Sequence, residues 1–575
     1  MERLEAKIVN GHTYYYYSKW ARVGKRCRRV WQKYLGKLED IARVVDEGGP
    51  TPACADVFQW GLPQALWQEA VRADLAVLID ARLPKRRQGL TTGQYLTLAA
   101  LNRAIAPSSK RAMWDWFAQS GLVRHLPEAS AESLCSQRFW DHMHKLGADA
   151  VAAIWKSLLQ GVVQRERLDL SSISYDGTNF YTFIDTFNVR SDLARRGKNK
   201  QGRDNLRQVS YALFCCADGH LPLYYDVYEG NRNDSKQFPA VLERFRRFFQ
   251  DLGGQPGSAP ETTLIFDKGN NSADNFRLLD QMSLHFVGSV KLDEHPELAA
   301  VANSDARFTA ASAPGLEATK CFRVKKVVAD RERVLVVTYN QNLFNAQWLT
   351  LQKDIERATI KLAALQQKLR DRSTGLITKG RAPTIPSVTS QAKKSLSRQH
   401  LRKVIATTID TDAKGLPRLS YTINADALKK ISETCLGKTI LISSRDAWAS
   451  DRIITAYRSQ FIIEGVFKGM KDRRTGTWWP MHHWTDSQIK VHGLYCAIAM
   501  LLRGLMWRRV SQAGLKLSMN RLLSELACIK EVINIYPPKR GQKAERKQAV
   551  LSRTSDLQQH LLKILKIEKQ AIMAT

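Results

Sequence analysis

Hydrophobic and polar residues alternate after residue 170 in a pattern that predicts strands separated by helices. An apolar run ends at Asp267, and Asn271-Ser272 is placed to cap a helix that follows and runs through Met282. A turn is expected at Asp218-Gly219, between two of the strands. The expected strands are Ser172–Asp176, Val209–Ala217, Leu221–Glu229, Thr262–Phe266 and His285–Val290. Alternating strand and helix signals of this kind predict an α/β core.

The charge of the chain points to a partner. Lys and Arg number 88 against 55 Asp and Glu, which gives a formal net charge of +33 over 575 residues. Such an excess favours a polyanion, and DNA in particular, over an enzyme that is merely basic. The longest strongly apolar run, Leu494–Leu502, is too short to cross a bilayer, so no membrane partner is expected. Nine scattered cysteines without a CxxC pair predict a reduced, cytoplasmic protein.

The amino-terminal third has two patterns of its own. Residues 1–50 alternate basic and aromatic side chains, which predicts a basic hairpin that turns at Gly24-Lys25. This hairpin either contacts DNA or packs on the core. Helical spacing follows over residues 56–165. The basic side chains near a helix junction there, Arg103, Lys110 and Arg111, are consistent with a helix-turn-helix-like DNA reader.

The interval between Asp267 and Glu464 is too long for one simple connection, so an inserted domain is expected between them. After Glu464, Asp486 is placed to cap a helix through Arg509, and the chain from Asn520 to Thr575 is predicted to be helical. The elements expected inside the interval are strands over Phe322–Tyr339, a long helix over Asn345–Arg372, a basic loop over Ser373–Arg398 and a return strand at Lys438–Ser443.

The stretch from 457 to 471, YRSQFIIEGVFKGMK, has the most specific spacing in the chain. Its polar members are Tyr457, Gln460, Glu464 and Lys471. If the stretch forms one α-helix, these four side chains lie within about 60° of one another on its surface. A carboxylate, a lysine, a tyrosine and an amide on one helix face suit a site that binds both a metal ion and a phosphate.

Two aspartates complete this pattern. Asp176 lies in the sequence SYDGT, and Asp267 follows the apolar run LIF. Together with Glu464, they resemble the acidic motifs of the DDE transposases of bacterial insertion sequences, specifically the IS-four superfamily with its Tyr-Arg-Glu-Lys signature. Gly219–Leu223 and Gly230–Asp234 match the strand-and-loop segment that follows the first motif in that family.

One position departs from the family signature. Gln460 stands where the family has arginine; an amide donates a hydrogen bond to phosphate but brings no charge. Lys468, at about 20° on the same helical wheel, is placed to supply the missing positive charge. Arg458, at about 100°, is less well placed.

The resemblance implies an RNase H-like catalytic core interrupted by an inserted domain, with helical N-terminal DNA-binding and C-terminal regions. The expected domains are a basic β-rich segment 1–55, a helical DNA-binding domain 56–165, core parts 166–294 and 438–512, an insertion 295–437 of strands plus a long helix, and a helical C-terminal region 513–575.

The resemblance also implies a DNA transposase that binds the terminal inverted repeats of an insertion sequence as a homodimer on double-stranded DNA. Cut-and-paste cleavage and strand transfer in the bacterial cytoplasm, at the nucleoid, are expected. Asp176, Asp267 and Glu464 would hold Mg2+, with Mn2+ as a substitute, because all are hard oxygen donors. Trp448 and Trp348 are candidates to hold a flipped base. The expected DNA-binding residues are Tyr457, Gln460, Lys468, Lys471, Arg458 and Trp448.

Two other functions share these features. A hydrolytic RNase H-fold DNA nuclease would have the same metal triad without strand transfer. A catalytically inactive DNA-binding relative would have a broken triad, whereas this chain has all three acids. His482 and His483 are potential metal ligands, but no carboxylate or cysteine stands at ligand spacing beside them, so no metal site is expected there.

Overall fold

A computed structural model of the chain describes residues 2–23, 26–46, 51–83, 89–198, 202–219, 221–252, 262–472, 474–538 and 544–567. The chain forms two compact units. Unit 1 comprises Met1–Gln68, Ala112–Glu132 and Arg509–Thr575, and unit 2 comprises Glu69–Arg111 and Ser133–Arg508. Both candidate aspartates and the 457–471 stretch belong to unit 2.

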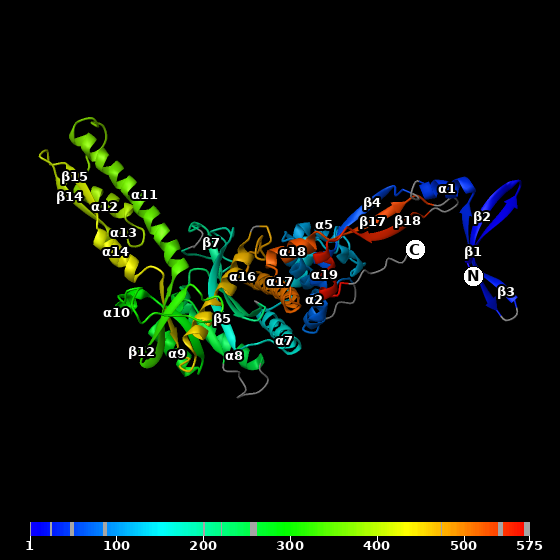
Figure 1. Ribbon diagram of the computed structural model, residues 1–575, viewed down its shortest axis with the longest axis horizontal. Coiled ribbons are helices and arrows are strands. Elements are labelled where there is room, and N and C mark those ends of the chain that lie inside the picture. Colours follow the sequence, from blue (N-terminus) through cyan, green and yellow to red (C-terminus); the bar gives the residue numbers. More distant parts are fainter. Residues whose placement is uncertain are drawn as a thin grey trace. The chain divides into compact units, whose positions relative to one another are not determined.

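The amino-terminal part of unit 1 is a three-stranded antiparallel sheet in the order β1-β2-β3 (Figure 1). The prediction of a hairpin is confirmed, although the predicted turn residues Gly24 and Lys25 lie outside the described residues. Aromatic side chains hold the strands together, as in the edge-to-face pair of Tyr17 and Trp31. The elements are β1 Glu2–Val9, β2 His12–Val23, β3 Arg26–Gly36 and helix α1 Leu38–Asp46.

The rest of unit 1 joins distant parts of the chain. Strand β17 pairs with β4 on one side and with β18 on the other. The helical segment predicted from residue 56 begins at α2, because residues 54–59 form β4. The prediction of a helical carboxyl-terminal region is wrong for β17 and β18, because the backbone groups of these strands are paired across the sheet. Arg124 forms a two-bond ion pair with the buried Glu531 of β17. The elements are β4 Cys54–Gln59, α2 Gly61–Arg72, α5 Met113–Ala118, the 3-10 helix η2 Gly121–Arg124, α18 Met519–Ala527, β17 Lys530–Tyr536, β18 Arg546–Leu551 and α19 Asp556–Leu565.

The helical part of unit 2 buries two residues predicted to read DNA. Arg103 is 2% exposed and Lys110 is 7% exposed, and both cations lie over the ring of Tyr495, at 5.7 and 4.4 Å from its centroid. The prediction of a helix-turn-helix-like reader is wrong for these two side chains. The elements are α3 Leu75–Asp80, α4 Thr92–Ile105, the 3-10 helix η1 Lys110–Ala112, α6 Ser136–Met143, α7 Ala148–Glu166 and α17 Asp486–Gln512.

Helix α17 is more apolar than the run Leu494–Leu502 indicated. By length and composition, α17 could cross a bilayer. Among the described residues, it is the one unbroken helix that is long and apolar enough to do so. However, 94% of its apolar window is buried within the structure. Packing inside the protein therefore accounts for its composition.

A 10-stranded sheet is the centre of unit 2, in the order β11-β12-β13-β16-β10-β9-β5-β7-β6, with β8 paired to β7. Strands β5, β9 and β10 run parallel, and the pairs β5-β7 and β7-β8 are antiparallel. All five predicted core strands are present, and Ser272 caps α9 as expected. The elements are β5 Ser172–Tyr181, β6 Arg195–Arg196, β7 Arg207–Cys216, β8 Pro222–Glu229, α8 Asp234–Leu252, β9 Thr263–Phe266, the 3-10 helix η3 Lys268–Asn270, α9 Ala273–Gln281 and β10 His285–Val290.

The interval 295–437 contributes to two structures. Strands β12 and β13 extend the large sheet, where β13 pairs with the return strand β16. The remainder has a hydrophobic core of its own, in which the 33-residue helix α11 packs against the hairpin β14-β15 (Figure 1). The elements are the 3-10 helix η4 Leu292–Glu294, α10 Pro296–Ala299, β11 Thr309–Ala310, β12 Thr319–Val328, β13 Arg331–Asn340, α11 Gln341–Ser373, α12 Ile385–Ser395, α13 Leu401–Val404, β14 Ile405–Thr411, β15 Pro417–Ile423, α14 Ala425–Thr434 and β16 Lys438–Ser443.

The predicted loop over Ser373–Arg398 contains helix α12, so that prediction is wrong. Thr384 begins the helix with a capping box to Ser387, and Val388 and Ala392 are buried in the core shared with α11. Two buried apolar side chains four residues apart give this basic, polar segment a helical face that the sequence pattern did not reveal.

Candidate active site

Asp176 and Asp267 lie on two adjacent parallel strands. Asp176 belongs to β5, and Asp267 directly follows the last residue of β9. Tyr175 pairs with Phe266, so the two aspartates occupy the next positions in register, on strands about 4.8 Å apart. Each carboxylate accepts a hydrogen bond of 2.7 Å from the backbone N–H of the following residue. The predicted proximity of these two acids is thus a consequence of strand register.

Tyr457 connects a helix to this edge of the sheet. It lies near the end of α15 (Ser450–Arg458), which packs on β9 and β10. Its hydroxyl lies 2.8 Å from the Oγ atom of Ser289 and 3.3 Å from Oδ1 of Asp267. Burial, together with the charges of Asp267 and Glu464, raises the pKa of Tyr457 to about 12. The side chain is therefore a neutral hydrogen-bond donor at ordinary pH.

The stretch from Tyr457 to Lys471 was predicted to be one α-helix, and this prediction is wrong. Helix α15 ends at Arg458 and α16 spans Phe461–Lys471. The backbone N–H of Gln460 bonds to the carbonyl of Tyr457, three residues earlier, and that of Ile462 bonds to Ser459 in the same way. The Ser459 hydroxyl also donates to the Ala456 carbonyl, at 2.6 Å. Local side-chain bonding of this kind competes with the α-helical ladder and shifts the phase of the predicted stripe.

Lys471, at the end of α16, lies beside the strand of Asp176. Helix α16 packs on β5 and β7. The ammonium group of Lys471 donates to the hydroxyl of Thr178, two residues after Asp176, and lies 5.5 Å from the ring of Phe180. The Lys471 cation is thus fixed to a residue two positions after Asp176, on the same face of the strand as that aspartate.

Glu464 lies in the first turn of α16 and is exposed. Its charge acts on the Tyr457 hydroxyl together with that of Asp267. Within the described chain, however, no three His, Cys, Asp or Glu side chains lie close enough to hold a metal ion as they stand. The donor set still fits a hard divalent cation, because two carboxylates on adjacent strands and a third on the facing helix offer oxygen atoms alone.

The remaining residues of the predicted DNA-binding set have different surroundings. Gln460 is buried, at 6% exposed, in the turn between the two helices. Arg458 donates to the carbonyl of Gly315 and to the hydroxyl of Thr319, each at 2.7 Å. Lys468 is exposed on α16. Of these three, Lys468 is the one whose side chain lies open to solvent.

The two tryptophans considered for base holding are both partly buried. Trp448 packs against the core under α15, with the guanidinium groups of Arg452 and Arg445 at 4.0 and 5.2 Å from its ring. Trp348 packs against the separate core of the 295–437 interval and stacks on Phe344. Trp448 therefore belongs to the same body of packed side chains as Tyr457, and Trp348 does not.

His483 and Ser289 are two further buried side chains with polar partners. His483 is buried and its Nε2 lies 2.8 Å from the Tyr495 hydroxyl, so this ring has a structural partner. Ser289, which the sequence analysis did not single out, is buried beside Asp267 and Tyr457. The one sequence signal for it was a polar residue within the apolar strand His285–Val290.

A family model described as the transposase DDE domain matches residues 173–501. This range is more than half of the chain and includes Asp176, Asp267 and Glu464. The chain belongs to the DDE transposase family. The family implies an RNase H-like fold for the mixed sheet of unit 2, and DDE transposases use divalent metal ions.

Among solved structures, the transposase is similar to the cryo-EM structure of a piggyBac transposase synaptic complex with hairpin DNA. The sequence identity is 11% and the TM-score is 0.34, over 81% of this chain and 78% of that chain. No curated protein sequence matches the transposase.

Proposed function

We propose that this DNA transposase is encoded by a bacterial insertion sequence of the IS-four superfamily and acts on its terminal inverted repeats in the cytoplasm, by cut-and-paste cleavage and strand transfer. The observation that carries the proposal is the register of β5 and β9, which sets Asp176 beside Asp267. Tyr457 contributes a neutral hydroxyl at the same place. Burial raises the pKa of this tyrosine and the charges of both Asp267 and Glu464 raise it further, so both acids lie within electrostatic range of its hydroxyl.

Asp176, Asp267 and Glu464 would hold the metal, with Mg2+ or Mn2+ preferred because the donors are all carboxylate oxygens. When bound, such ions stabilise both the attacking and the leaving oxygen of an in-line displacement at a phosphodiester. The exposed position of Glu464 on α16 leaves its side chain able to rotate toward the two aspartates.

The chain's own cations would hold the DNA at this site. Lys471 is already fixed beside β5 through Thr178, which suits a contact to the phosphate next to the cleaved bond. Lys468, one turn earlier on the same helix and exposed, takes the role of the family arginine, because Gln460 is buried. Arg458 and Trp448 contribute as supports of α15, through their contacts to Thr319 and Arg452.

The test is incubation of the protein with Mg2+ and a DNA that carries the terminal repeats of its element. Cleavage at the repeat ends and joining of those ends to a second DNA are expected. Cleavage without joining would identify a hydrolytic nuclease, and binding without cleavage would identify an inactive relative. Either outcome would overturn the proposal.

A homodimer on DNA is part of the same proposal, since cut-and-paste transposition requires both ends to be held together. The net charge of +33 opposes association of the free protein until DNA neutralises it. Mass measurement with and without end DNA tests this point, followed by mixing of an Asp176→Ala protein with a DNA-binding variant. A complex that keeps one protein per DNA end throughout cleavage would contradict the dimer.

A further inference from the structure

The segment between β5 and β7 begins at Thr182, directly after the strand that carries Asp176. We call residues 182–206 the β5–β7 connection; residues 199–201 within it are outside the described part. Its basic side chains in the described part are Arg190, Arg195, Arg196, Lys198 and Arg203. None of these side chains belongs to the proposed metal site or to the predicted DNA-binding set.

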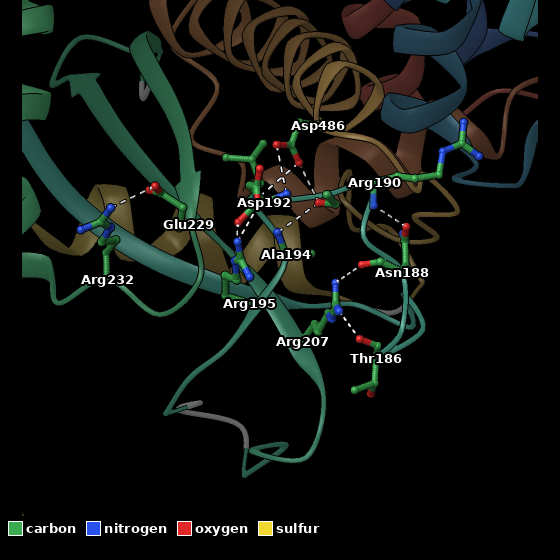
Figure 2. A network of polar contacts seen from close by, with 12 residues as sticks. Thr186, Asn188, Arg190, Asp192, Ala194, Arg195, Arg207, Glu229, Arg232 and Asp486 are labelled. Atoms are coloured by element: carbon green, nitrogen blue, oxygen red, sulfur yellow. Dashed lines mark hydrogen bonds and ion pairs between the residues drawn. The ribbon is translucent and has the colours of Figure 1, made fainter.

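Local hydrogen bonds fix the first part of the connection. The Asp185 carboxylate accepts from the backbone N–H of Phe187, at 2.7 Å, which forms an Asx turn. The Asn188 side chain repeats the pattern with the N–H of Arg190, at 2.8 Å. Arg207 donates to the carbonyls of Asn188 and Thr186 (Figure 2). The backbone is thus held from both sides.

Asp486, in the first turn of α17, fixes the second part. Its carboxylate accepts from the hydroxyl of Ser191 at 2.7 Å and from the backbone N–H groups of Asp192 and Leu193, both at 3.1 Å (Figure 2). From its position in the sequence, Asp486 was predicted to cap its own helix. It instead binds a segment almost 300 residues earlier in the chain, so the connection is anchored to the core helix α17.

In spite of this anchoring, the connection leaves large apolar side chains in solvent. Phe187 is 89% exposed, Val189 is 91% exposed and Phe183 is 71% exposed. An ordered backbone that presents apolar side chains outward does not serve the core of its own unit. Exposed apolar patches with a polar surround mark interaction sites.

The charges around the patch indicate what it binds. Arg190, between Val189 and the anchored Ser191, is exposed, and its side chain extends away from the network in Figure 2. A cavity of about 800 Å3 lies beside the connection, but its arginines are neutralised, Arg195 by Asp192 and Arg232 by Glu229. Arg190 therefore offers a polyanion an exposed positive charge next to the apolar patch, whereas in the cavity, whose arginines are paired, the exposed cation is Lys236.

We propose that Phe187 and Val189 form an apolar wedge that enters the base stack of the duplex whose strand is cleaved, with Arg190 on an adjoining phosphate. The proposal rests on the proposed function. Apolar wedges flanked by arginine are an established way of kinking DNA.

From Asp176 to the end of β5 is about 17 Å, or roughly five base pairs of B-DNA. Arg207, opposite that end, accepts from the N–H of Thr182 and donates to the carbonyl of Thr186, so the connection stays near the end of the strand and one duplex would reach both sites. A second copy of this chain, with the same net charge of +33, is a poorer match for Arg190.

The test uses an end duplex with the fluorescent adenine analogue 2-aminopurine at successive positions, since unstacking raises its emission. Wild-type protein is expected to brighten one position about five base pairs from the cleavage site. Phe187→Ala is expected to abolish that signal and to reduce cleavage by about 5- to 100-fold, whereas Phe187→Trp retains both. Arg190→Ala is expected to weaken binding and to lower its salt dependence.

Matched controls are Val327→Ala, an equally simple truncation of an exposed apolar residue (66% exposed), and Arg357→Ala, an exposed arginine on α11. Both are expected to behave as wild type. An unchanged signal and cleavage rate in Phe187→Ala overturn the wedge. A signal that appears only with target duplex also overturns the wedge. The same holds if Phe187→Ala changes only the association of protein subunits, seen in a mass measurement, and leaves the fluorescence signal and cleavage unchanged.

The two proposals fail separately. The fluorescence signal needs binding but no chemistry, so an Asp176→Ala protein is expected to show it in full. A wild-type protein that gives the Phe187-dependent signal without cleaving DNA would overturn the proposed function and support the wedge. A protein that cleaves and joins ends with no such signal would support the proposed function and overturn the wedge.

Discussion

The hydroxyl of Tyr457 lies 3.3 Å from Oδ1 of Asp267, across the junction between helix α15 and the end of strand β9. The same hydroxyl lies 2.8 Å from the buried Ser289 on β10. One tyrosine thus joins the helix preceding Glu464 to the two strands that flank the second aspartate. This contact fixes where the third acidic motif meets the sheet.

Removing that hydroxyl is expected to slow cleavage and to spare DNA binding. Tyr457→Phe loses a hydrogen bond to a charged carboxylate, which corresponds to about a tenfold loss in single-turnover cleavage rate. The matched control is Tyr421→Phe, a partly buried tyrosine of β15 in the separate core of the 295–437 interval. A variant that cleaves at the wild-type rate would show that the hydroxyl has no part in placing Asp267.

Replacing the acids one at a time is expected to stop the chemistry. Asp176→Ala, Asp267→Ala and Glu464→Ala should each reduce cleavage by a factor of about 1,000 or more, because each removes a metal ligand. Binding to end DNA should change little in a gel-shift measurement, because affinity comes mainly from basic contacts. Glu332→Ala on β13, an exposed acid of the same sheet, is the control. Any acid whose loss leaves cleavage intact does not belong to the site.

Metal dependence follows from the same donor set. Cleavage is expected with Mg2+ or Mn2+ and is not expected in the presence of a chelator. Adding either ion back should restore it. Zinc should not be required, because no histidine or cysteine is part of the proposed ligand set. Metal analysis of the purified protein provides the check, and stoichiometric zinc would contradict the assignment.

DNA binding is expected to depend steeply on salt. A chain with a net charge of +33 that neutralises several phosphates releases their counterions. Affinity should fall by at least about tenfold between roughly 50 and 200 mM salt. Fluorescence anisotropy over a salt series measures the slope. A flat response would place the excess charge away from the DNA.

Acid is expected to destabilise unit 2. Burial, aided by the nearby charge of Lys110, lowers the pKa of His483 well below 6.5, and burial together with the charge of His483 does the same for His492. Below pH 6.5 the unfolded state therefore binds more protons than the folded state, and the free energy of unfolding falls as pH drops. Above that pH, these two histidines do not change the free energy of unfolding with pH.

The expected loss at about pH 5.5 is about 1 kcal/mol for each histidine, seen by urea unfolding against a sample at about pH 7.5. His483→Gln should reduce the slope, and His560→Gln, at an exposed position of α19, should not. Equal slopes in wild type and His483→Gln would contradict the assignment.

Local patterns predicted the core strands because each depends on its own alternation or apolar run. The run ending at Asp267 and the strand His285–Val290 were found in this way, as was the long helix α11. Strands β4 and β17 were missed, because each is short and exposed in part and is stabilised by a partner far away in the chain. Pairing of that kind leaves no periodic signal in either segment.

The sequence by itself determined the acidic motifs, the basic charge and the α/β class, since these depend on residue identity and on short-range periodicity. Only the tertiary structure decided which side chains meet. Strand register sets Asp176 beside Asp267, the turn at Ser459 divides the predicted helix, and Asp486 binds Ser191 in place of its own helix end. Each of these outcomes depends on competition between local hydrogen bonds and partners remote in the chain, and a single linear pattern does not contain the energy of that competition.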